Sequence, residues 1–104
     1  MPSKADPSLD DLLGELVRET PDVKVADGRE FTRDGVLFAA RPESNAIELR
    51  LGPEIADAAM RTPHTGPSSR GEEWIRLEAI DWMDAGDRLQ AWYRLAWRLA
   101  KNRR

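Results

Sequence analysis

The amino-acid sequence predicts an α+β domain in which an antiparallel sheet of about five strands packs against helices, in the order α-β-β-β-β-α-β-α. Three observations support this prediction. Apolar residues recur at helical spacing near both ends, apolar and polar residues alternate in the middle, and Asp-Gly pairs separate the predicted strands. With 104 residues and no cysteine, the chain has the length of one small domain without disulfides or thiolate metal sites.

The first predicted helix begins after Ser8 and ends before Pro21. Ser8 can cap this helix, and Asp11 follows three residues later, as in a capping box. The apolar residues are spaced three or four positions apart and form one face; they are Leu9, Leu12, Leu13, Leu16 and Val17. We therefore expect this helix to pack against the sheet.

Four strands are predicted after this helix, at residues 22–26, 29–33, 35–41 and 46–51. The pairs Asp27-Gly28 and Asp34-Gly35 mark two tight turns, because glycine accepts the positive φ angle that such turns need. The polar segment 42–45 marks a third turn. We expect these strands to be neighbours in an antiparallel sheet.

The strand at 46–51 has the clearest alternation. Its apolar positions are Ile47, Leu49 and Leu51. The residues between them, Glu48 and Arg50, are charged. This pattern predicts that one face of the strand is buried and that the charged face is in water.

The remaining elements are a short helix that begins at Pro53, a loop over residues 61–73, a strand at 74–79 and a helix from about Asp84 to Lys101. At 100° per residue, one stripe of the last helix is apolar. Its members are Ala85, Leu89, Trp92, Tyr93, Ala96, Leu99 and Ala100. We expect residues 7–101 to form one domain, with a disordered tail at 1–6 and a basic tail at 102–104.

Several features of the second half follow one another in a recognisable order. They are the strand at 46–51, the helix start at Pro53-Glu54, the loop at Pro63-His64, the strand opened by Trp74 and the amphipathic last helix. Over about residues 30–100 this order resembles the MmcQ/YjbR-like group of small bacterial α+β proteins. The resemblance implies a two-layer fold with an antiparallel sheet, in a family often labelled DNA-binding. It supplies no catalytic residue.

The loop at 61–70 combines hydroxyl groups, glycines and positive or titratable side chains, a combination that suits phosphate or carboxylate binding. The candidate anion-binding residues are Arg61, His64, Ser68, Ser69 and Arg70. The alternative is that the segment only connects a helix to a strand and is stiffened by Pro63 and Pro67.

The last helix supplies a second candidate surface, for a partner or a nucleic acid, formed by Arg94, Trp97, Arg98 and Lys101 and continued by Arg103 and Arg104. Alternatively, the basic residues complement the helix dipole and Trp97 covers the edge of the core under the first helix. The net charge of −3 disfavours nucleic acid, because phosphate-binding proteins usually carry a positive balance.

No catalytic motif is present, so we expect a non-catalytic binding or interaction module, with an enzyme that uses His64 and a nearby carboxylate as an alternative. We expect no cofactor and no metal, because no ligand spacing supports either. The longest apolar run has five residues, 36–40, which predicts a cytoplasmic protein without a membrane partner. The partner is an unknown protein or an anionic ligand, and the protein is a monomer or a weak homodimer.

Overall fold

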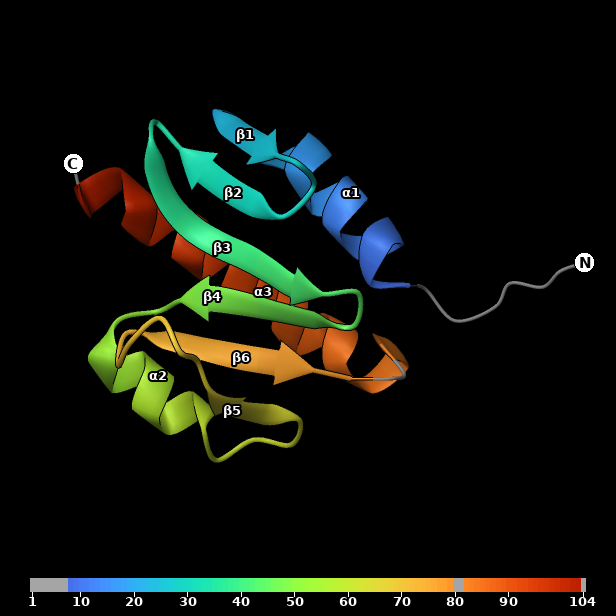
Figure 1. Ribbon diagram of the computed structural model, residues 1–104, viewed down its shortest axis with the longest axis vertical. Helices are drawn as coiled ribbons and strands as arrows, with labels where there is room; N and C mark the ends of the chain where they lie inside the picture. Colours follow the sequence, from blue (N-terminus) through green and yellow to red (C-terminus); the bar gives the residue numbers. More distant parts are fainter. Residues whose placement is uncertain (1–7, 80–81, 104) are drawn as a thin grey trace, which may run out of the picture.

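The computed structural model describes residues 8–79 and 82–103 and confirms the α+β class (Figure 1). One layer is a six-stranded antiparallel sheet in the order β1-β2-β3-β4-β6-β5. The strands are β1 (Val23–Ala26), β2 (Glu30–Arg33), β3 (Val36–Glu43), β4 (Ala46–Arg50), β5 (Thr65–Pro67) and β6 (Trp74–Glu78). The helices are α1 (Leu9–Glu19), α2 (Pro53–Ala59) and α3 (Trp82–Ala100), which is followed by the 3-10 turn η1 (Lys101–Arg103).

The predicted tail at 1–6 lies outside the described residues, as does residue 104 of the predicted basic tail. The other two residues of that tail continue α3 as part of η1. None of the described helices combines the length and the apolar character that crossing a membrane requires.

Helix α1 begins at the predicted capping box. The Asp11 amide donates to Ser8 Oγ at 3.1 Å, and the Ser8 amide donates to Asp11 Oδ2 at 3.4 Å. The predicted apolar face is turned inward, since Leu9, Leu13 and Leu16 are at most 3% exposed. The helix therefore packs into the core as its sequence predicts.

The sheet contains one strand more than the five expected. Strand β5 lies within the predicted loop 61–73 and pairs antiparallel with β6, Gly66 opposite Arg76. Proline is tolerated at Pro67 because β5 is an edge strand with no further neighbour to accept a ladder hydrogen bond. The segment lacks the alternating apolar pattern that predicts a strand, so its pairing comes from the fold rather than from its own sequence.

A β-bulge aims two consecutive side chains of β3 at the helices. The register between β2 and β3 shifts after Phe31, which lies opposite Ala39, whereas Thr32 lies opposite Leu37. Phe38 is therefore the extra residue of the bulge, and it is fully buried. Its ring meets the Tyr93 ring edge-on at a centroid distance of 5.3 Å.

The core lies between the sheet and the pair α1 and α3, which both lie on the far side of the sheet in Figure 1. The fully buried stripe of α3 consists of Ala85, Leu89, Tyr93, Ala96 and Ala100. Trp92 and Leu99, expected in this stripe, are only half-buried. They lie at its border, where the sheet no longer covers the helix completely, and Trp92 still packs against the core.

A buried hydrogen-bond chain links α1 to α3. The Thr20 hydroxyl donates to the Leu16 carbonyl at 2.7 Å, so the Tyr93 hydroxyl, 3.1 Å away, donates to Thr20 Oγ1. Burial raises the pKa of Tyr93 above its ordinary value.

Candidate functional site

Strand β5 and the turns around it position the residues of the predicted anion-binding loop. Thr62 Oγ1 donates to the Ala59 carbonyl at 2.7 Å and lies 2.8 Å from Thr65 Oγ1, which ties the start of β5 to the end of α2. His64 has a positive φ of 67° at the turn before β5. Residues 62–65 are therefore held as a compact turn.

Two of the predicted residues, Ser68 and Arg70, meet at a buried carboxylate. Ser68 Oγ donates to Glu48 Oε2 at 2.8 Å, and Arg70 Nε donates to Glu48 Oε1 at 2.9 Å. The Ser68 hydroxyl also accepts the Arg70 amide at 3.0 Å. The Glu48 side chain is only 5% exposed, although the alternation in its strand predicted a solvated position. Glu48 is buried because segment 68–70 folds over the otherwise open face of the sheet and covers it.

The other predicted residues of this loop point elsewhere. Arg61 lies 3.7 Å from Asp57 one turn back, in a pair whose side chains are both 77% exposed. The His64 carbonyl accepts a hydrogen bond from the Glu78 amide, so His64 lies beside the last residue of β6, whereas Trp74 is the first residue of that strand. The His64 side chain is exposed. Ser69 is also exposed. The five predicted residues thus divide between two ends of β5 and do not face one common ligand.

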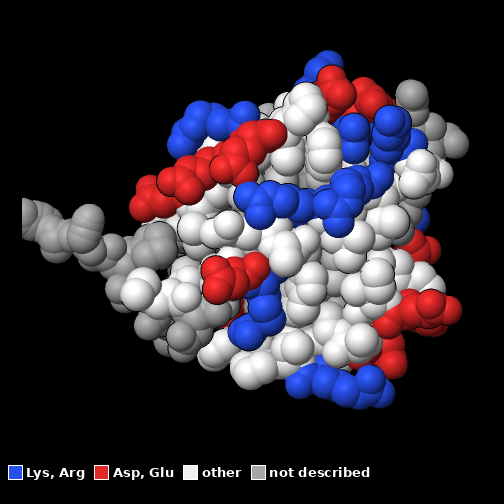
Figure 2. All heavy atoms as spheres, turned by 180° about the vertical axis from the view of Figure 1, so that it is seen from behind, with Lys and Arg blue, Asp and Glu red and all other residues white. Residues whose placement is uncertain are grey.

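The predicted surface on α3 is partly occupied by contacts within the protein. Trp97 Nε1 donates to the Pro21 carbonyl at 3.0 Å, and the Arg33 guanidinium lies 3.8 Å from the Trp97 ring centroid. Trp97 therefore closes the rim of the core, which is the second of the two expectations for this residue. Arg94 donates to Glu19 at 2.7 Å, whereas Arg98 and Lys101 are exposed. Figure 2 shows this side of the molecule, where a band of basic side chains is bordered by acidic ones.

The same segment that covers Glu48 forms a wall of a cavity of about 420 Å³ beside α2. We call it the α2 cavity; it is lined by Pro53, Asp57, Met60, Pro67, Ser68, Gly71, Glu72 and Trp74. The wall is built from two consecutive turns. In the first the Gly71 amide donates a hydrogen bond to the Ser68 carbonyl, and in the second the Trp74 amide donates one to the Gly71 carbonyl. Gly71 has a φ of 131°, a conformation that glycine adopts without strain.

A smaller hollow of about 150 Å³ borders the same turn at 71–74 and is lined by Arg50, Arg70, Gly71, Glu72, Glu73 and Trp74. Arg50 Nε donates to Glu73 at 2.9 Å, and the Arg70 guanidinium lies 5.4 Å from the Trp74 ring centroid. Each arginine of this hollow is therefore already held by a glutamate.

The neighbouring Arg76 is likewise paired on the same face of the sheet. It contacts Glu43 and Glu78 at 3.2 Å each. Desolvation opposes the charged form of Arg76, but the hydrogen bonds that Arg76 donates to Glu78 and Glu43, together with the negative charges of these carboxylates, outweigh it and raise the pKa of Arg76. The open face of the sheet is thus a set of compensated charges.

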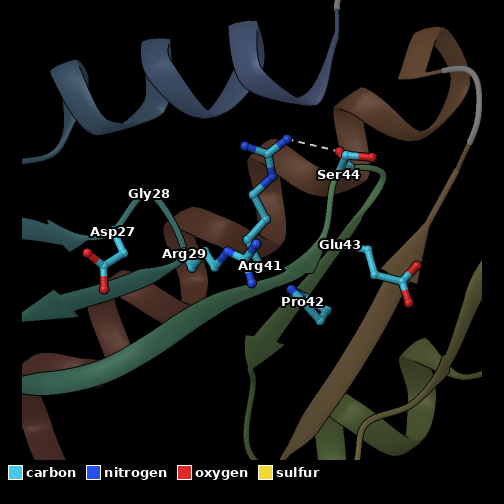
Figure 3. Close-up of a pocket in the computed structure, with 7 residues that line it drawn as sticks. All are labelled: Asp27, Gly28, Arg29, Arg41, Pro42, Glu43 and Ser44. Atoms are coloured by element: carbon cyan, nitrogen blue, oxygen red, sulfur yellow. Dashed lines mark hydrogen bonds between the residues drawn. The ribbon is translucent and has the colours of Figure 1, made fainter.

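A third cavity, of about 340 Å³, lies where the β1–β2 hairpin ends beside the longer β3–β4 hairpin (Figure 3). Asp27 and Gly28 both have positive φ angles and make the predicted tight turn. Arg41 also lines the cavity, and its guanidinium extends toward α1 (Figure 3); it donates to the Ser44 carbonyl at 2.9 Å and pairs with Asp10. Arg41, one of the two arginines that line this cavity, is therefore engaged in contacts within the protein.

Sequence reasoning located the segment that forms the candidate site but missed most of its residues. Asp57 belongs to α2 and Met60 directly follows this helix, and nothing in the sequence indicates that the helix folds beside residues 67–74. Within the described part of the chain, no three His, Cys, Asp or Glu side chains lie close enough together to hold a metal ion.

Comparison with models of protein families, with curated proteins and with solved structures finds no match to this chain. The resemblance to the MmcQ/YjbR-like group therefore stays a prediction.

Proposed function

We propose that this protein is a non-catalytic binding domain and that the α2 cavity holds its ligand. The observation that carries the proposal is the buried contact of Glu48 with Ser68 and Arg70, 2.8 and 2.9 Å long. Burying a carboxylate is costly unless hydrogen bonds and an opposite charge compensate it. Here both fix the surface segment 68–70, whose first residue, Ser68, lines the cavity between Pro67 and Gly71.

A preformed wall favours binding, because the entropy of ordering the segment is lost in folding rather than on contact with the ligand. The cavity also has the mixed lining of a ligand site, with apolar side chains such as Met60 and Trp74 and few polar groups.

The proposal is tested by titrating the ¹⁵N-labelled protein with a library of small fragments that includes cations, anions and neutral molecules. We expect the largest chemical-shift changes at the amides of Met60, Ser68 and Gly71. Met60→Ala should reduce them, whereas Ile55→Ala, on the same helix but outside the cavity lining, should not. No change at these amides with millimolar fragments, or changes concentrated elsewhere, contradicts the proposal.

A further inference from the structure

We infer that the α2 cavity selects an organic cation with an apolar body, a primary ammonium or guanidinium carried on an alkyl or aromatic group. This inference rests on the proposed function and specifies the chemistry of its ligand. Of the described residues that line the cavity, two carry charge, Asp57 and Glu72, and both are acidic. They come from different segments, one from α2 and one from the turn at 71–74.

Both carboxylates are available to a ligand. The structure records no hydrogen bond or ion pair for the Glu72 side chain within residues 8–79 and 82–103, and that side chain is exposed. Asp57 has Arg61 as a partner, at 3.7 Å with both side chains 77% exposed. A pair so exposed contributes little, so Asp57 loses little by turning to a ligand.

The uncharged part of the lining suits the body of such a cation. Pro53, Met60 and Pro67 offer apolar surface, and Trp74 offers an aromatic ring. The ring already carries the Arg70 guanidinium at 5.4 Å. The Trp74 ring thus already makes one cation–π contact, and this is the kind of contact that we expect a bound organic cation to make with the lining.

An anion finds no such support in this cavity. The basic side chains near the lining are already paired with carboxylates: Arg61 contacts Asp57 at 3.7 Å, and Arg50 and Arg70, which line the smaller hollow, are held by Glu73 and Glu48. An anion in the α2 cavity would instead meet Asp57 and Glu72. The predicted anion-binding role of the 61–70 segment therefore gives way to a cation-binding role for the cavity beside it.

The test compares three probes of similar shape and different charge: 2-phenylethylammonium, 2-phenylethanol and 3-phenylpropionate. Each is titrated into the full-length ¹⁵N-labelled protein while the amides of Met60 and Gly71 and the Trp74 indole are followed. We expect saturable shifts with the ammonium, about tenfold weaker binding of the alcohol, and no saturation with the carboxylate.

Neutralising variants assign the effect to the two carboxylates. Glu72→Gln and Asp57→Asn should each weaken binding of the ammonium by up to about fivefold, the size expected for one exposed ion pair. The double variant should bind the ammonium and the alcohol equally. Glu54→Gln, an exposed glutamate of α2 outside the lining, is the matched control and should bind like the original protein.

The outcomes separate this inference from the proposed function. Equal or tighter binding of the alcohol or the carboxylate at the same amides overturns the cation assignment and leaves the binding site standing. No shift at these amides with any probe or fragment overturns both. A parallel titration with acetyl-Gly-Arg-Gly-amide distinguishes the source of the cation, since tighter binding than 2-phenylethylammonium indicates a basic peptide side chain rather than a free amine.

Discussion

Strand β4 carries buried side chains on both faces of the sheet, and the two faces are buried in different ways. Ile47 and Leu49 point to the helices and have no exposed surface. Glu48, between them, points to the opposite face and is 4% exposed, yet its contacts are the hydroxyl of Ser68 and the guanidinium of Arg70. Apolar burial is non-directional and stabilises the whole fold, whereas the hydrogen bonds fix one segment in one place.

The first prediction concerns the helix-covered face and has the largest expected effect. Leu49→Ala removes a fully buried side chain and should lower the free energy of unfolding by about 2–5 kcal/mol. Urea denaturation followed by far-ultraviolet circular dichroism measures this change. A loss below about 1 kcal/mol would indicate that the two faces do not differ in the way described.

The second prediction concerns the opposite face of the sheet, at Glu48, the residue before Leu49. Glu48→Gln removes the charge that holds Arg70, which is 35% exposed and can turn to water, so the expected loss is about 1–3 kcal/mol. Exchange of the Arg70 amide, bonded to Ser68 Oγ, should accelerate more than that of amides in β4. Glu43→Gln, on the same face but 64% exposed, is the control and should change neither.

The third prediction concerns a polar group inside the apolar core, the hydroxyl of Tyr93. Tyr93→Phe should cost about 1 kcal/mol at neutral pH, because it removes the hydrogen bond to Thr20. The pKa of Tyr93 is raised in the folded protein, so the unfolded chain ionises first. The contribution of Tyr93 to the free energy of unfolding is therefore complete below a pH of about 10, and it declines as the pH rises through the pKa of Tyr93 in the folded protein.

Urea denaturation of both proteins on either side of that pH measures the effect. The original protein should lose its advantage over Tyr93→Phe as the solution becomes more alkaline. Because the chain has one tyrosine, tyrosinate absorbance reports on Tyr93 alone. A constant difference between the two proteins across this range would contradict the assigned direction of the pKa shift.

The smallest expected effect concerns a charge pair outside both faces. Arg94→Gln breaks the pair with Glu19, in which the side chains are 41% and 55% exposed, and should cost about 0.5 kcal/mol or less. Thermal unfolding at low and high salt provides the measurement. A loss as large as that of Glu48→Gln would show that exposure does not separate structural from marginal ion pairs in this protein.

Local sequence patterns predicted the elements whose own residues determine them. The capping box at Ser8 and Asp11 formed as expected, as did the tight turn at Asp27-Gly28. The alternation of Ile47 and Leu49 with charged residues correctly identified the face that the helices cover. In each case the signal lies within a few neighbouring residues, which is the range over which propensity and periodicity act.

Local sequence patterns did not predict the features that depend on contacts between distant segments. Strand β5 forms because β6 offers an edge, and Glu48 is buried because segment 68–70 folds over it. The sequence left two expectations open for Trp97, and its contacts with Pro21 and Arg33, which are distant in the chain, decide between them. The α2 cavity has the same origin, since its two walls are separated in the chain and come together only through the tertiary fold.

The position of α3 at the end of the folding unit has a consequence for synthesis. The last strand ends at Glu78, and the helix that covers the apolar side of the sheet runs to Ala100. A nascent chain can therefore pair its strands before it can cover them, and it emerges from the ribosome with Ile47, Leu49 and Leu77 open to water. Packing of the complete helix α3 against the sheet ends that exposure.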